Sequence, residues 1–170
     1  MIDQLKEKLT GIVANKLPAL SKQEYRDFID AFGIQLGDLP GAVTGNVPGT
    51  LKHTFAGGMY IRQITMPANT VWCTKVHKYE SPYFIMSGDV SVISDEGVMR
   101  IKAPYQGVTK EFTKRILVVH EETVWTTVHV TSKKEVEEVE RELTVGLFSE
   151  IEQEKGEEIC HSHIPQSVGQ

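Results

Sequence analysis

The sequence predicts a mainly β fold, a closed barrel or sandwich of short strands with helices at both ends. Between residues 59 and 130, short runs rich in Val, Ile, Thr and aromatic residues alternate with Gly, Pro, Asp or Asn. The runs recur at a spacing of roughly ten residues, which is typical of barrels and sandwiches. Before and after this region, apolar residues recur instead at steps of three and four, which indicates helices.

Two helices are predicted at the N-terminal end. The first has one apolar face and ends near Lys16, before Pro18; the face consists of Ile2, Leu5, Leu9, Ile12 and Val13. Ser21 and Glu24 form a capping-box pattern that opens the second helix, which ends at Gly33. Residues 1–33 are therefore expected to form a helical hairpin that covers the core or supplies an oligomer contact.

The remaining chain divides into a connection, a barrel and a C-terminal part. Residues 34–58 are rich in Gly and Pro and are interpreted as a connecting loop, so that the hairpin and its connection occupy 1–50 and the barrel 51–131. The predicted strands are 59–65, 71–77, 83–86, 90–94, 98–102, 115–120 and 124–130, with a hairpin turn at 94–97. Ser132 and Glu135 suggest another capping box for a C-terminal helix within 132–150. Residues 151–170 are expected to be a polar, flexible tail.

Composition narrows the class of protein. The 170 residues favour one domain, and 40% hydrophobic with 24% charged residues is ordinary for a globular protein. A net charge of −5 argues against general nucleic-acid binding, which needs clustered Lys and Arg. No apolar run approaches the ~20 residues that span a membrane. The two cysteines, Cys73 and Cys160, fit a reducing compartment, so a cytoplasmic location is expected.

The region around residues 67–88 carries a resemblance to a known family. The turn 67–69, His77 and Gly88 together resemble the first motif of the cupins, small jelly-roll β-barrels. Aligned on Gly88, this motif puts Lys75 and His77 at its two His positions and Ser81 at its Glu position, with Glu80 adjacent. The second motif fits best at residues 110–115, where Phe112 replaces its Gly and Arg115 replaces its His. One of the four metal-ligand positions is thus matched, and the resemblance implies a cupin-type jelly-roll barrel.

A wider resemblance points to uncharacterised cupin-like proteins, many of them phage-encoded. It is carried by the strings HKYESPYFIMSGDVSVISDEG, APYQG and KRILVVHEETVWTTVH, and it covers about residues 59–145. The group has no established reaction, so this resemblance implies a fold and leaves the function open.

Side-chain alternation along the strands predicts which polar residues share the barrel interior. If Arg115 points inward, so do Leu117 and Val119, while His120 points outward. His77 and His129 are expected to line the same cavity as Arg115. An arginine at a ligand position repels a divalent cation and suits an anion. The anion-binding residues predicted on this basis are Lys75, His77, Arg115, His129 and Arg62, while a degenerate metal site would consist of His77, Glu80 and His129.

Three functions follow from these residues. The first is a non-enzymatic, homo-oligomeric accessory or structural module, phage-encoded and located in the host cytoplasm. The second is a binder of a small anionic ligand, a nucleotide or sugar derivative, in the barrel. The third is a cupin enzyme that uses a divalent transition metal. A metal-free epimerase would instead pair a His base with a Tyr acid, for which Tyr60, Tyr79, Tyr83 and Tyr105 are available. No catalytic residues are assigned.

Overall fold

A computed structural model describes residues 20–45, 47, 49–151 and 153. The helices that flank the strands include α2 (Lys22–Gly37) and α3 (Val136–Leu143), and a further helical segment begins at Phe148. The strands are β1 (Leu51–Ala56), β2 (Met59–Met66), β3 (Thr70–Cys73), β4 (Val76–His77), β5 (Ser81–Ser94), β6 (Gly97–Lys102), β7 (Tyr105–Thr109), β8 (Ile116–Val130) and β9 (Thr144–Val145). The predicted first helix and the tail with Cys160 lie outside the described residues. No helix among the described residues is long and apolar enough to span a membrane.

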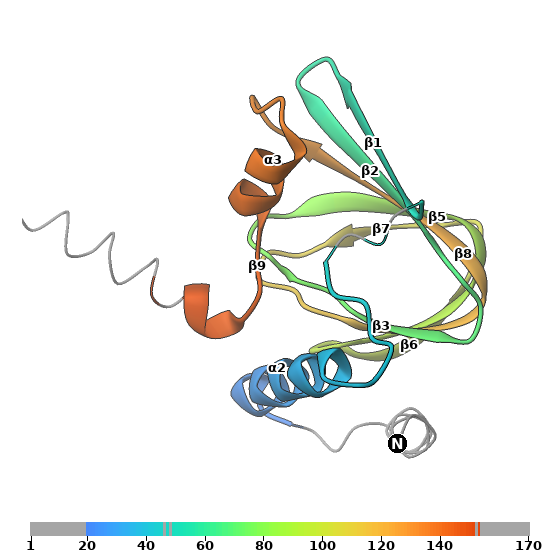
Figure 1. Cartoon of the computed structure of the whole chain (residues 1–170), viewed down its shortest axis with the longest axis vertical. Helices are drawn as coiled ribbons and strands as arrows, with labels where there is room; N and C mark the ends of the chain where they lie inside the picture. The colour runs from blue at the N-terminus through green and yellow to red at the C-terminus, as the bar shows by residue number, and fades with distance from the viewer. Residues whose placement is uncertain (1–19, 46, 48, 152, 154–170) are drawn as a thin grey trace, which may run out of the picture.

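All strand pairs are antiparallel, and two long strands organise them. β5 and β8 pair with each other, and between them they contact β2, β3, β6 and β7, while β1 extends the sheet beyond β2. The long strands bend so that the sheet curves around an interior (Figure 1). β4 and β9 form a separate two-stranded sheet. The predicted mainly β class with few helices is confirmed.

Several predicted strand boundaries were wrong. Residues 51–56, interpreted as part of a loop, form β1 in register with β2. Residues 83–86 and 90–94 belong to one continuous strand, β5, and 115–120 and 124–130 fall largely within β8. Residues 87–89, which separate two of the predicted strands, are instead an irregularity within β5, where the register against β8 shifts. Gly88 has a φ of +98° there, and a Cβ at this position would lie 2.7 Å from Thr123 Cα.

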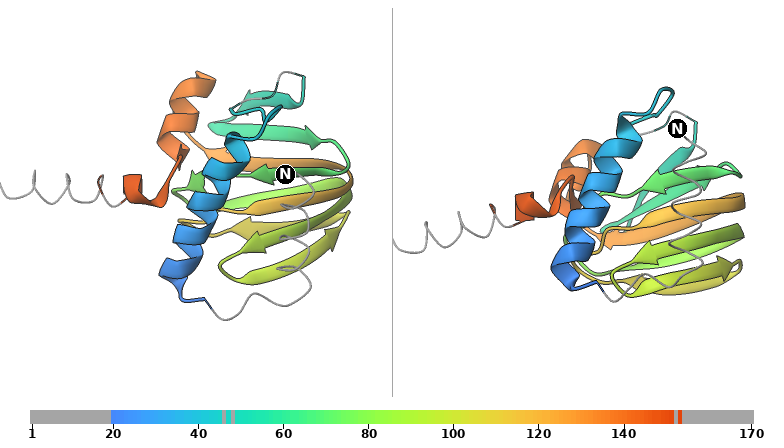
Figure 2. Two further views of the ribbon diagram at one scale, coloured as in Figure 1. Left: turned by 60° about the horizontal axis from the view of Figure 1, so that its bottom comes forward. Right: turned by 90° about the horizontal axis from the view of Figure 1, so that it is seen from below.

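Two apolar clusters lie on opposite faces of β8. Leu117, Val119 and Trp125 point into the barrel and pack with residues of β2 and β5. Ile116 points outward and packs against Tyr25 and Ile29 of α2. As Figure 2 shows, α2 runs across the strands on one side of the barrel. The alternation predicted for β8 is therefore confirmed.

The two helices differ in how they begin. Ser21 and Glu24 form the predicted capping box, in which Ser21 Oγ accepts from the Glu24 amide and the Glu24 carboxylate accepts from the Ser21 amide. The cap predicted for α3 was wrong, because that helix begins later and its N-cap, Glu135, makes no side-chain cap bond. α3 lies beside β1 and β2 (Figure 1) and packs Val139 against Tyr60.

Candidate functional site

Four basic side chains gather toward one end of the barrel and are called the cationic cluster here: Arg62 of β2, His77 of β4, Arg115 just before β8, and His129 of β8. The register of the strands explains why Arg62 and His129 lie near each other. β2 pairs with β8 so that Arg62 is opposite Thr127 and Tyr60 is opposite His129. Alternation along each strand then places these side chains on the inner face. The structure thus brings together four of the five residues predicted to bind a ligand, and that they bind one stays a prediction.

The two imidazoles of the cluster stack on each other. The rings of His77 and His129 lie 6.3 Å apart, centroid to centroid, at an interplanar angle of 8°. His77 is held by backbone contacts with Thr113 on one side and with β9 on the other. Its Nδ1 is buried without a hydrogen-bond partner among the described residues. A buried ring nitrogen without a partner costs free energy, which a bound polar ligand would recover.

Burial and the neighbouring arginines keep both histidines neutral. Burial, with smaller contributions in the same direction from Arg115, His129 and Arg62, lowers the pKa of His77 to about 3. Burial, with a smaller contribution from Arg62, lowers the pKa of His129 to about 4. At neutral pH the charge of the cluster is therefore that of its two guanidinium groups.

Arg115 is the most enclosed charge of the cluster, with 8% of the residue exposed. Its guanidinium donates to Thr109 Oγ1 at 3.0 Å and lies 5.3 Å from the centroid of the Tyr83 ring and 6.0 Å from that of Trp125. Burial lowers the pKa of Arg115, although an arginine side chain remains charged in a protein. No carboxylate forms a salt bridge with Arg115 or Arg62 within the described part of the chain.

Two aromatic rings, of Tyr83 and Trp125, form a wall beside Arg115, and Gly107 leaves space for the Tyr83 ring. Tyr83 stacks on Trp125 with ring centroids 4.6 Å apart and an interplanar angle of 16°. Gly107 of β7 is paired with Tyr83, and a Cβ at Gly107 would lie 2.7 Å from the Tyr83 ring. Only glycine therefore allows the ring to lie over the strand in this position. No local pattern in the sequence predicts this role of Gly107, because the role depends on the pairing of β5 with β7.

A His–Tyr pair extends the cluster toward β1. The Nδ1 of His53 lies 2.7 Å from the hydroxyl oxygen of Tyr60, whose ring stacks on His129 with centroids 6.2 Å apart. Burial raises the pKa of Tyr60 to about 12, and Tyr60 is almost completely buried. His53 was missed because its segment was interpreted as a loop, although the alternation of LKHTFA is a strand signal.

Two of the predicted site residues lie elsewhere. Lys75, predicted to bind the ligand, is exposed between β3 and β4 and pairs with Glu140 of α3 at 3.4 Å. Glu80 is exposed after β4, and no three His, Cys, Asp or Glu side chains among the described residues are placed to hold a metal ion. His77, Glu80 and His129 thus do not form the predicted metal-ligand set, because the chain turns outward after β4. His120 lies on the outer face, as predicted, 2.8 Å from Ser91 Oγ.

Comparisons with known proteins give fold-level likenesses. No family model and no curated protein matches the chain. A cupin-2 domain containing protein from Shewanella frigidimarina has a TM-score of 0.41 at 10% identity, over 61% of this chain and 91% of that one. A putative ethanolamine utilization protein, EutQ, from Salmonella typhimurium has a TM-score of 0.43 at 12% identity, over 52% and 79%.

KdgF from Halomonas sp. is similar to the same degree, with a TM-score of 0.42 at 10% identity over 52% of this chain and 87% of that one. The first of these three is named for the fold type that the sequence resembles. Because the identities are low and all three TM-scores are below 0.5, no reaction, cofactor or ligand of these proteins is transferred to this chain.

Proposed function

We propose that the protein binds a small anionic ligand at the cationic cluster inside the barrel. The observation that carries this proposal is Arg115, a nearly buried guanidinium with a single hydrogen bond to a hydroxyl and no carboxylate partner among the described residues. Burying an unpaired charge costs free energy, and proteins normally offset this cost by pairing it. A ligand that carries a carboxylate or phosphate would supply the missing charge.

The side chains of the site favour a ligand with a flat or cyclic part beside its anionic group. Arginine binds carboxylate and phosphate through parallel hydrogen bonds, and Arg62 adds a second charge nearby. The neutral His77 and His129 provide ring nitrogens that donate or accept hydrogen bonds. Tyr83 and Trp125 provide aromatic surface next to Arg115. Nucleotides and sugar acids combine these features, so they are the proposed ligand classes.

A thermal-shift screen with full-length protein tests the proposal. The panel contains inorganic phosphate, citrate, nucleoside mono- and diphosphates, and uronic acids, each at several concentrations. A ligand present at 100 times its Kd stabilises the folded state by about 2.7 kcal/mol, which raises the Tm of a protein of this size by roughly 5–10 °C. Absence of any shift across the panel would contradict the proposal.

Two variants locate the site. Arg115→Lys keeps the charge but removes the paired donors, so it is expected to weaken binding about tenfold or more. Lys75→Gln removes a positive charge of an exposed residue outside the cluster, and it should leave the affinity unchanged. An equal loss of affinity in both variants would show that the anion binds through the general positive charge of the protein rather than through Arg115.

A second proposal is the homo-oligomeric, non-enzymatic accessory module, phage-encoded and acting in the host cytoplasm. It is supported by exposed apolar side chains on the outer face of β5 and β7, where Met86 is 60% and Val108 is 56% exposed. Val108 pairs with Pro82, which is also exposed, so the patch spans two neighbouring strands. Light scattering at several concentrations tests it: Met86→Lys with Val108→Lys should lower the mass of an oligomer, and a strictly monomeric wild type would contradict it.

A further inference from the structure

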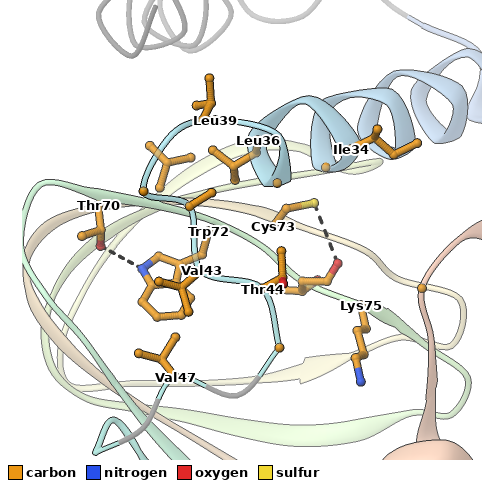
Figure 3. A pocket seen from close by; sticks show the side chains of 18 of the residues that line it. Ile34, Leu36, Leu39, Val43, Thr44, Val47, Thr70, Trp72, Cys73 and Lys75 are labelled. Carbon is orange, nitrogen blue, oxygen red and sulfur yellow. Dashed lines mark hydrogen bonds between the residues drawn. The ribbon is translucent and has the colours of Figure 1, made fainter.

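A groove lies between α2, the loop that follows it and β3. Its volume is about 820 Å³, and most of the side chains that line it are apolar. Figure 3 shows the end of α2 and the loop that follows it curving around Trp72 and Cys73. The lining includes Ile34, Leu36, Leu39, Val43, Trp72 and Cys73. Ile34 is 55% and Val43 is 64% exposed, so large apolar side chains face the groove without cover from the described residues.

We infer that residues 1–19 of the same chain fill this groove, as an antiparallel helix beside α2. The apolar positions 2, 5, 9, 12 and 13 give that segment one hydrophobic face, which needs an apolar partner. Across the groove, Ile34 and Val43 are apolar surface that needs a cover. This inference is independent of the proposed anion binding, because none of the four residues of the cationic cluster lines the groove.

The lengths of the two segments match. A helix over 2–16 is roughly 22 Å long at 1.5 Å per residue, and the path along α2 from Lys22 to Gly37 is about the same. Pro18 separates the segment from the Ser21 cap, where a chain reversal is favoured. A helix that returns along α2 from this point places Ile2 and Leu5 beside Ile34 at the groove.

Connection to α2 favours this occupant over a separate molecule. The segment is joined to α2 by a few residues, so its effective concentration at the groove is in the millimolar range. A second copy of the chain or a free apolar ligand has to compete with that concentration. Both remain outcomes of the experiment below.

The test uses full-length variants with matched charge. Leu5→Glu with Leu9→Glu puts two carboxylates on the apolar face of the segment, whereas Gln4→Glu with Ala14→Glu puts two on its opposite face. The first pair is expected to lower the Tm by about 4–8 °C, and the control pair by much less. The first pair should also increase quenching of Trp fluorescence by acrylamide, because Trp72 lines the groove whereas Trp125 is buried.

A double-mutant cycle then asks whether the segment touches the groove. Ile34→Glu should lower the Tm of the wild type and have little further effect in the Leu5→Glu, Leu9→Glu background. An equal effect in both backgrounds, or unchanged Trp quenching, would overturn the inference. Light scattering separates the occupants: an unchanged mass in all variants supports docking within one chain, whereas a lower mass for Leu5→Glu, Leu9→Glu would overturn it in favour of a second copy.

Discussion

Lys114 and Asp30 form a nearly buried ion pair that joins α2 to two other parts of the chain. The Nζ of Lys114 lies 2.7 Å from Asp30 Oδ1 and donates to the carbonyl oxygen of Gly146 at 2.8 Å. The other carboxylate oxygen of Asp30 accepts from the amide of Phe148 at 2.9 Å. The helix, the start of β8 and the segment after β9 are thus fixed together by two side chains, of which Lys114 is 4% exposed.

Removal of one member of this pair should destabilise the protein strongly. Asp30→Ala leaves the Lys114 ammonium buried without its partner, so we expect a loss of about 3 kcal/mol in urea unfolding. Glu96→Gln is the control, because the Lys110–Glu96 pair has both side chains more than 60% exposed and should lose at most about 1 kcal/mol. Lys114→Met combined with Asp30→Ala should recover part of the loss, and a double variant no better than Asp30→Ala would contradict this account.

Two features that depend on local sequence patterns were predicted correctly. The capping box of Ser21 and Glu24 is a local pattern, and the structure has it as predicted. The alternation of Leu117 and Val119 along β8 is also local, and Arg115, two residues before Leu117, continues it, so the inward direction of Arg115 was predictable from the sequence. Lys75 was misplaced because β3 ends at Cys73 and β4 begins at Val76, and this break in the strand depends on pairing with distant residues of β8 and β9.

β5 and β8 were each predicted as two shorter strands for a related reason. Ser87, Gly88 and Asp89 are turn residues by type, but pairing with β8 carries β5 through them with shifts in register. Asp89 is buried and held by two hydrogen bonds of 2.8 Å from Arg100 of β6. Likewise, Gly107 matters only because β7 pairs with the strand that carries Tyr83. Such roles depend on tertiary contacts, which no local pattern contains.

Stability should fall as the pH drops below neutral, because His77 and His129 resist protonation only in the folded state. Their pKa values of about 3 and about 4 in the folded protein lie below the unfolded value of 6.5. The unfolded chain therefore binds protons first as the pH falls from about 6.5 toward 4. Each histidine contributes up to about 1.4 kcal/mol of lost stability per pH unit in this window.

Urea unfolding at pH 7.5, 6.5, 5.5 and 5.0 checks this prediction and stays above the range in which most carboxylates titrate. His77→Gln with His129→Gln should flatten the pH dependence between 6.5 and 5.0 relative to wild type. A profile with the same slope in both proteins would show that other groups account for the acid sensitivity.

Gly107→Ala should disturb the aromatic wall of the site. The added Cβ would lie 2.7 Å from the Tyr83 ring, which must then move away from Trp125 or push β7 outward. We expect a loss of about 1–3 kcal/mol of folding stability and weaker binding of any ligand found in the screen. Gly37→Ala is the control: the nearest contact of its Cβ is Thr44 at 3.6 Å, and alanine is favoured over glycine in a helix. Near-UV circular dichroism should report the altered Tyr83–Trp125 stacking in the first variant and no change in the second.

Arg115→Met separates a ligand-binding role for Arg115 from a structural one. If the guanidinium serves a ligand, the ligand-free protein bears the cost of an uncompensated buried charge. Replacement by a side chain of similar length that carries no charge should then leave stability unchanged or raise it by about 1 kcal/mol. The thermal shift by an anionic ligand should disappear in the same variant.

If Arg115 instead holds Tyr83 and Thr109 in place, the ligand-free variant should lose more than about 1 kcal/mol of folding stability, because both contacts are then missing. Urea unfolding of ligand-free wild type and variant at pH 7.5, followed by the same measurement with ligand, distinguishes the two, and marked destabilisation of the ligand-free variant would contradict the binding role.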